Sequence, residues 1–198
     1  MDIVSAGRHP PGSTAEDVAN TLKTLRDEGY FEHAGASEVS AETVEKMNKV
    51  SQPSSSSSSL PRLPLFTLIH ILSRLQRIAD AQIIPIEVVE IEVSLWSWEK
   101  DIQKTVAHCK SKSIPVFAYS PLGRGFISRT WKTPEDVPKG SFQSTLPRFQ
   151  GEAFYDNLKL VDQLDELAAA KGLKTTQLAL AWIAHLSPYV SGSVVSEE

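Results

Sequence analysis

The chain has 198 residues, of which 41% are hydrophobic and 22% charged, with a net charge of −4 and a pI near 5.8. This composition is typical of an ordinary globular protein, and it lacks the concentrated basic surface that nucleic-acid binding requires. Cys109 is the single cysteine, which excludes an intrachain disulfide and a cysteine-cluster metal site. The amino terminus has no signal-peptide pattern, and no apolar run reaches the roughly 20 residues of a membrane-spanning helix. We therefore expect a cytoplasmic protein.

The first predicted element is a helix. Ser13 followed by Glu16 matches a capping box, in which a hydroxyl and a carboxylate satisfy the unpaired amides of a first helical turn. Apolar residues then recur at helical spacing until a glycine at which a left-handed stop is expected: Val18, Leu22, Leu25 and Gly29. We predict a strand over His33–Ser37 next, and then a helix over residues 41–47 that Ser40 opens.

Three further elements follow the serine-rich middle of the chain. Residues 88–94 alternate apolar with acidic side chains, which is typical of a strand. Residues 101–112 have the apolar spacing of an amphipathic helix. Residues 114–119 are almost continuously apolar, and this pattern predicts a short strand that is buried on both faces.

The last two predicted elements are helices. Residues 152–171 predict a long helix that Gly172 ends, and Thr175 or Thr176 caps a final helix that runs through His185. Taken together, the elements alternate between strands and helices. Such alternation predicts an α/β fold in which crossover helices join parallel strands.

Two acidic residues of the predicted strand 88–94 could carry chemistry. Glu90 and Glu92 lie two positions apart, so both carboxylates face the same side of the strand. A pair of carboxyl groups about 5–10 Å apart can serve as the acid and base of a glycosidase. The alternative is that both residues fill polar positions in the lumen of a barrel or line a site. The five histidines show no metal-ligand spacing, so we expect no metal site.

The segment IPVFAYSPLGRGF, residues 114–126, is the most informative part of the chain. A predicted buried strand ends in Tyr119, and a loop with glycines and Arg124 follows it. The carboxyl ends of parallel strands are where α/β proteins form their sites. An aromatic ring there can stack on a planar heterocycle, and loop amides with an arginine can hold phosphate. The segment therefore indicates either a nucleotide-binding loop or a structural loop.

Five segments together resemble the aldo-keto reductase family, and within it the fungal branch that includes pyridoxal reductases. They are EGYFEHAGASEVSAETVEKMNK, VVEIEVSLWSWEKDIQ, IPVFAYSPLGRGF, LPRFQGEAFYDNLKLVDQLDELAAAKG and TTQLALAWI. The resemblance implies about half of a TIM-type (β/α)8 barrel, from a remnant of strand 4 through strand 7 with the helices that follow. It also implies NADPH as cofactor and the reduction of small aldehydes or ketones, such as pyridoxal, to alcohols.

The resemblance also implies a set of cofactor-binding residues. Ser37 and Glu38 correspond to the residues that hold the nicotinamide carboxamide, and Glu90 stands where most of the family has a glutamine. Tyr119 matches the ring that stacks under the nicotinamide. The loop that follows the pyrophosphate is matched by Ser120, Leu122 and Arg124.

The catalytic residues of the family have no counterparts in this sequence. In the family a tyrosine protonates the carbonyl oxygen, and a lysine, an aspartate and a histidine assist it. We expect this chain to begin after the strands that carry the tyrosine, lysine and aspartate, with Gly7 in place of the histidine; His9 is not assigned that role. We thus predict no catalytic residue and an inactive chain. The alternative is a non-catalytic protein that binds a nucleotide or a partner on the same scaffold.

The chain divides by composition into four parts. Residues 1–49 and 83–190 are the first and second parts of the partial barrel, residues 50–82 are a low-complexity insertion, and residues 191–198 are a tail unlike the family. Without the insertion, the flanks join as EKMNKIIPIEVVEIEVS, which matches the family without a gap.

The insertion has two interpretations. It is either a tolerated surface insertion or, as we favour, a translated intron. Val50-Ser51 can be encoded by a splice-donor sequence and Gln82 by an acceptor, and translated pyrimidine-rich DNA is crowded with serine, leucine and proline. As protein, the insertion predicts a disordered serine linker followed by an amphipathic helix over residues 63–78.

Overall fold

A computed structural model describes residues 3–7, 12–50 and 86–192 of the chain. The predicted serine linker, the amphipathic helix over residues 63–78 and His9 lie outside these described residues, as do residues 193–198 of the predicted tail. Within the described part, no helix is both long enough and apolar enough to cross a membrane. The same part of the chain contains no group of three or more histidine, cysteine or acidic side chains that could hold a metal ion.

In the part of the chain that the structure describes, five strands form one sheet, and their order in the sheet is their order in the sequence. The strands are β1 (Ile3–Ala6), β2 (His33–Ser37), β3 (Ile86–Glu92), β4 (Val116–Tyr119) and β5 (Val190–Gly192). The pairs β1–β2, β2–β3 and β4–β5 are all parallel. Sequential parallel strands require crossover connections, as the alternation of elements in the sequence predicts. The predicted α/β fold with a parallel sheet is therefore confirmed.

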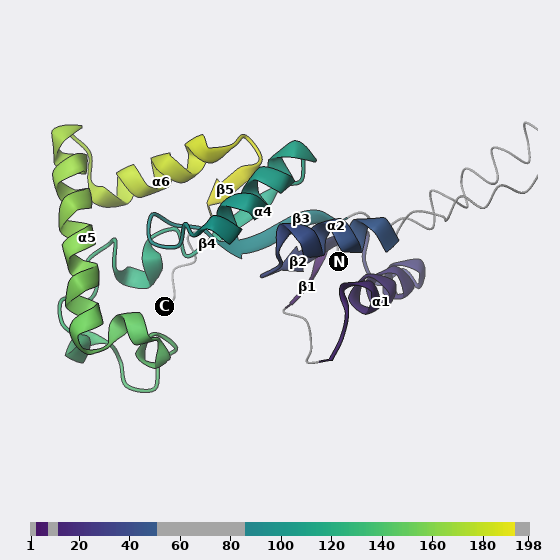
Figure 1. Cartoon of the computed structure of the whole chain (residues 1–198), viewed down its shortest axis with the longest axis horizontal. Helices are drawn as coiled ribbons and strands as arrows, with labels where there is room; N and C mark the ends of the chain where they lie inside the picture. The colour runs from purple at the N-terminus through teal and green to yellow at the C-terminus, as the bar shows by residue number, and fades with distance from the viewer. Residues whose placement is uncertain (1–2, 8–11, 51–85, 193–198) are drawn as a thin grey trace, which may run out of the picture. The chain divides into compact units, whose positions relative to one another are not determined.

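Within the described residues, α-helices lie between successive strands, one after each of β1, β2 and β3 and two after β4 (Figure 1). They are α1 (Ala15–Asp27), α2 (Ala41–Val50), α4 (Lys100–Ser111), α5 (Gly151–Ala170) and α6 (Thr175–Leu186). Each corresponds to a helix that the apolar spacing predicts, with ends that differ by at most a few residues. The chain divides into two compact units, Met1–Glu90 and Ile91–Glu198, and each is described separately below.

The close packing of the first unit depends on small side chains in β2. Ala34 and Ala36 are fully buried, and Gly35 lies between them. A Cβ atom added at Gly35 would lie 2.7 Å from Cγ1 of Val88 and would collide with the Ser5 hydroxyl. Glycine is therefore required for β2 to fit between its neighbours β1 and β3.

The capping box of α1 is one residue later than the sequence pattern predicts. Thr14 is the N-cap: its hydroxyl accepts from the amide of Asp17 at 3.1 Å, and Asp17 Oδ2 accepts from the Thr14 amide at 2.9 Å. The predicted pair, Ser13 and Glu16, does not form the box. Both pairs satisfy the same pattern, and the extended backbone of Thr14 selects the second. The predicted stop is confirmed, because Gly29 has φ of +84°.

A cluster of buried phenylalanine and valine side chains forms part of the core of the second unit. Its buried members are Phe126, Val137, Phe149, Phe154 and Val161. The Trp96 ring stacks on Phe126 with ring centroids 4.7 Å apart, and the rings of Phe126 and Phe149 lie 4.5 Å apart. The cluster joins the loop after β4 to α5.

Three local predictions for the second unit are corrected. β4 is buried on one face only: Val116 and Ala118 are buried, but Phe117 is 45% exposed because alternate side chains of a strand point to opposite faces. The cap of α6 is not a threonine. The Lys174 amide instead donates to Gln177 Oε1 at 2.9 Å, and the Thr175 hydroxyl donates to Asp165. The strand β5, which pairs with β4, is not predicted from the sequence.

An ion-pair network fastens the loop after β4 to α5. The Arg129 guanidinium binds the carboxylates of Asp162 and Asp165, and Asp165 also accepts from the Thr175 hydroxyl at the start of α6. Burial raises the pKa of Asp165, but the hydrogen bonds from Thr175 and Arg129 outweigh it and lower that pKa below its ordinary value. The pKa of Arg129 is raised, mainly by its hydrogen bond to Asp162.

The α1 cap provides a first test. Replacing Thr14 with alanine removes the hydroxyl that accepts from Asp17, so we expect T14A to lower the free energy of unfolding by about 1 kcal/mol. Replacing Ser13 with alanine should cost clearly less, since Ser13 is not the N-cap residue. Urea denaturation followed by far-ultraviolet circular dichroism measures both. A larger loss in S13A than in T14A would contradict the assignment.

The Arg129 network predicts a pH-dependent contribution to stability. A carboxylate whose pKa is lowered on folding stabilises the folded state above its unfolded pKa of about 3.9. That stability is lost as the pH falls through the lowered value. We expect R129M to cost about 0.5–1 kcal/mol at pH 7, because the pair is partly exposed, and almost nothing near pH 2. Urea denaturation at both pH values checks this, and an equal cost at both would show that the guanidinium contributes only by packing.

Candidate functional site

The structure groups the three predicted carboxamide-binding residues of the first unit. Ser37 is the last residue of β2 and pairs with Glu90 of β3. The Glu38 amide donates to the Glu90 carbonyl at 2.9 Å. Glu38 has φ of +55°, in the left-handed region that non-glycine residues seldom adopt. The three residues thus form one cluster at the carboxyl end of β2, held there by the parallel strand pair.

The predicted residues of the second unit lie at the carboxyl end of β4. Tyr119 is the last residue of that strand, and Ser120, Leu122 and Arg124 follow it in the loop. The Arg124 guanidinium carbon lies 5.6 Å from the centroid of the Tyr119 ring. Ser120 and Arg124 both have positive φ, +50° and +55°. Left-handed backbone at non-glycine residues is costly and concentrates at functional sites.

An acidic residue that the sequence did not connect with this loop holds Arg124 in place. Glu92 Oε2, at the end of β3, accepts from Nη2 of Arg124 at 2.6 Å and from Nε at 3.2 Å. The Arg124 and Glu92 side chains are only 18% and 14% exposed. Burial opposes the charge of Arg124, but the hydrogen bond and charge of Glu92, with smaller help from Tyr119, raise the Arg124 pKa above its ordinary value. Arg124 is therefore a permanently charged group in a fixed position.

Two aromatic side chains complete the surroundings of Arg124. The Phe142 ring, which is 54% exposed, lies with its centroid 4.9 Å from the guanidinium carbon. Trp131 donates from its indole nitrogen to the Arg124 carbonyl at 3.0 Å. A Cβ at Gly125, where φ is +98°, would lie 2.9 Å from Cδ1 of Trp131, so only glycine permits this contact. The loop conformation is thus fixed by contacts of the Arg124 side chain and by contacts of the backbone at Arg124 and Gly125.

Sequence reasoning missed the partners of Arg124. For Glu92 the sequence offers two roles, half of a glycosidase pair or a polar position. Glu92 accepts hydrogen bonds from Arg124 and, at 3.0 Å, from the Ser97 hydroxyl, and these contacts favour the second role. Phe142 has no motif of its own. The sequence does contain a signal for this pair: an acidic residue ends one strand, and an arginine follows the next strand. The signal becomes useful only when the two strands are known to be neighbours in the sheet.

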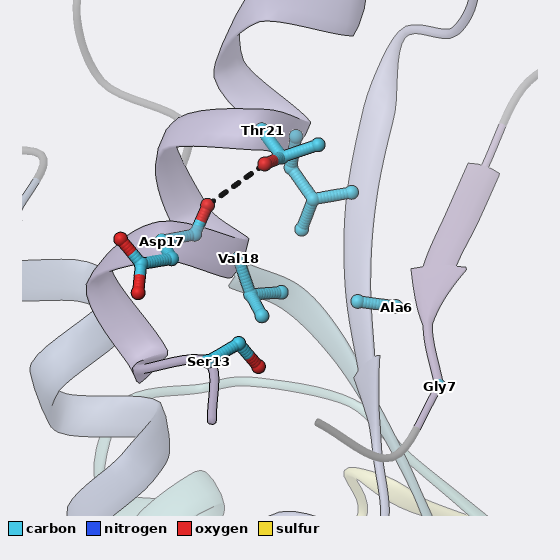
Figure 2. A pocket seen from close by; sticks show the side chains of 7 residues that line it. Ala6, Gly7, Ser13, Asp17, Val18 and Thr21 are labelled. Atoms are coloured by element: carbon cyan, nitrogen blue, oxygen red, sulfur yellow. Dashed lines mark hydrogen bonds between the residues drawn. The ribbon is translucent and has the colours of Figure 1, made fainter. Parts of the chain in front are cut away.

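A cavity of about 300 Å³ lies elsewhere, in the first unit (Figure 2). It is lined by residues of β1 and α1 and the segments next to them: Ala6, Gly7, Ser13, Asp17, Val18, Thr21 and Leu22. The Thr21 hydroxyl donates to the Asp17 carbonyl at 2.8 Å, and the Asp17 carboxylate belongs to the α1 cap. The cap amide and hydroxyl of Thr14 lower the pKa of Asp17. None of the predicted cofactor residues lines this cavity, although Gly7, at the predicted position of the family's histidine, does.

Comparisons with known proteins identify the family of this chain. A sequence model described as "Aldo/keto reductase family" matches residues 69–197, about two thirds of the chain. The chain belongs to the aldo/keto reductase family. A curated relative, "Aldo-keto reductase yakc [NADP(+)]" of Schizosaccharomyces pombe, is 28% identical over 185 residues, which are 92% of this chain and 45% of the relative. The chain spans about half the length of the relatives it matches.

Solved structures of the same family share the fold. The glycerol dehydrogenase AKR11B4 from Gluconobacter oxydans matches with a TM-score of 0.66 at 19% identity, over 98% of this chain and 49% of that one. The thermostable aldo-keto reductase Tm1743, crystallised with the inhibitor epalrestat, matches with a TM-score of 0.54 at 16% identity, over 97% and 48%. These neighbours are TIM barrels, so the predicted partial TIM-type fold is confirmed.

The pair between Glu92 and Arg124 should be measurable as a coupling energy. Because both groups are largely buried, we expect E92Q and R124M each to lower the free energy of unfolding by about 1–3 kcal/mol. The double variant should be more stable than the sum of the two losses predicts, by about 1–2 kcal/mol. Urea denaturation of the four proteins closes the cycle. Strict additivity would mean that the contact contributes no net stability.

Proposed function

We propose that this chain carries the dinucleotide-binding part of an NADP-dependent aldo-keto reductase, an oxidoreductase that reduces small aldehydes or ketones to alcohols. The observation that supports it best is the arrangement at the end of β4. There an aromatic ring and a permanently charged guanidinium lie together on a loop with left-handed backbone. This combination suits a ligand with a planar heterocycle and phosphate groups. The relative from Schizosaccharomyces pombe carries NADP(+) in its name.

Each strand-end residue then has a role in binding. Tyr119 stacks on the nicotinamide ring, and the loop of Ser120 and Leu122 follows the pyrophosphate, with Arg124 as its counter-charge. In the first unit, Ser37 and Glu38 hold the carboxamide with Glu90. The left-handed backbone at Glu38 supports this role, because strain at one residue persists only where surrounding contacts hold it.

Pyridoxal is the carbonyl substrate that the sequence favours, from the resemblance to the fungal pyridoxal-reductase branch. Bound NADPH supplies the hydride for such a reduction, and a protein acid must protonate the carbonyl oxygen. None of the four tyrosines of this sequence matches the family's acid: Tyr30, Tyr119, Tyr155 and Tyr189. We therefore propose that the 198-residue polypeptide binds NADPH without reducing carbonyl compounds by itself.

A binding titration with a turnover assay tests both parts of the proposal. We expect NADPH to quench the intrinsic tryptophan fluorescence of the full chain saturably. Y119A should weaken binding about tenfold or more, because stacking of a base on an aromatic ring contributes about 1–3 kcal/mol. The matched control is Y155A, which removes an exposed tyrosine of α5 that is 48% accessible and should bind normally.

The turnover assay uses pyridoxal and follows the absorbance of the reduced nicotinamide. Saturable binding without oxidation is the expected result. If no dinucleotide binds, the cofactor proposal fails. If NADPH is consumed in proportion to the alcohol formed, the polypeptide contains an acid that the sequence comparison does not assign.

A further inference from the structure

The helix α5 exposes a row of leucines beside the side that it buries. Its core-facing side is formed by Phe154, Val161 and Ala168. Leu160 and Leu167 are instead 51% and 48% exposed, and residues seven positions apart lie on the same side of a helix. Leu164, which is half-buried, lies between them on that side. These three residues, the leucine stripe, belong to a helix at the outer margin of the second unit (Figure 1).

One exposed charge continues the leucine stripe at each end. Asp156 is four residues before Leu160, and Lys171, the C-cap of α5, is four residues after Leu167. Residues four positions apart are neighbours on a helix surface. This side of α5 therefore begins with an acidic residue, continues with leucines and ends with a basic residue.

This order of side chains is complementary to itself when it is reversed. In a second copy of α5 that lies antiparallel to the first, Leu160 of each copy faces Leu167 of the other. The same register places Asp156 of each copy opposite Lys171 of the other, and it aligns the two helix dipoles favourably. A parallel copy would instead place like charges opposite each other, which is unfavourable.

The existing contact of Asp156 leaves it able to take a partner on another chain. Its carboxylate lies 2.7 Å from Nζ of Lys159, one helical turn further along α5. The two side chains are 60% and 72% exposed, and an ion pair so accessible to water contributes little stability. Exchange of Lys159 for the Lys171 of a second copy therefore costs little.

We propose that the leucine stripe is a self-association surface, through which two copies of the chain pair their α5 helices in antiparallel orientation. A second copy suits the stripe better than a lipid surface does, because α5 carries five acidic residues and only one lysine. Anionic membranes attract helices with the opposite charge balance. A single helix pair is a small interface, so we expect a weak dimer that forms as the protein concentration rises. The inference does not depend on the proposed function.

Sedimentation equilibrium of the full chain, from low to high micromolar concentration, tests the association. We expect L160E and L167E each to weaken the dimer about tenfold or more, because each buries a carboxylate in the apolar seam. The matched control is L25E, which changes a leucine of α1 that is 36% exposed and should leave the dimer intact. We expect D156K and K171E each to weaken the dimer and the double variant D156K/K171E to restore it.

Engineered cysteines test the orientation of the helices. The native Cys109 is fully buried, so an added surface cysteine is the reactive one. The antiparallel register centres on residues 163 and 164, so oxidised Q163C should form a disulfide between copies. D156C and K171C should each fail to do so alone but should join when they are mixed.

Four outcomes overturn the inference. They are a wild-type chain that stays monomeric throughout, a dimer that L160E and L167E leave unchanged, a disulfide in D156C alone, and a monomer that binds vesicles of anionic lipid through the leucine stripe. None of these outcomes changes the expected NADPH titration, so the proposed function is tested separately.

Discussion

The ion pair between Glu92 and Arg124 is the contact on which the candidate site of the second unit depends. It joins the end of β3 to the loop after β4, two segments 32 residues apart in sequence. Both groups are largely withdrawn from water, where a charge is costly unless it is paired and hydrogen-bonded. The pair therefore constrains the loop: the guanidinium is stable only where Glu92 reaches it, and that position places it beside Tyr119.

The aromatic core explains how a loop of this length can carry a defined site. From the end of β4 to the start of α5 the described chain contains only short 3₁₀ turns. Buried side chains at its two ends, Phe126 and Phe149, nevertheless pack against each other and against Phe154 of α5. Close-packed rings permit little displacement, so the backbone of the residues next to them in the sequence is also held in place.

Local patterns predicted the elements well, and the errors have identifiable causes. Periodicity and glycine stops depend on neighbouring residues alone, which is why His33–Ser37 and the stop at Gly29 were found. Overlapping Ser-Thr-Ala-Glu and Thr-Ala-Glu-Asp patterns cannot be separated without backbone angles, so the α1 cap was misplaced by one residue. The apolar composition of β4 predicts burial on both faces, but Phe117 is exposed, because composition does not reveal what covers each face of a strand. Contacts such as that of Glu92 with Arg124 require the strand order.

The carboxylate of Glu92 acts as a second constraint, because it faces two cations. Nη2 of Arg124 is 2.6 Å from one of its oxygens, and Nη1 of Arg148 is 3.8 Å from the other. Two guanidinium groups near each other repel, and a carboxylate that faces both offsets that repulsion. The same carboxylate would repel a phosphate group. Under the proposed function, Glu92 therefore fixes the position of Arg124 and lowers the affinity that an unopposed arginine would have for the dinucleotide.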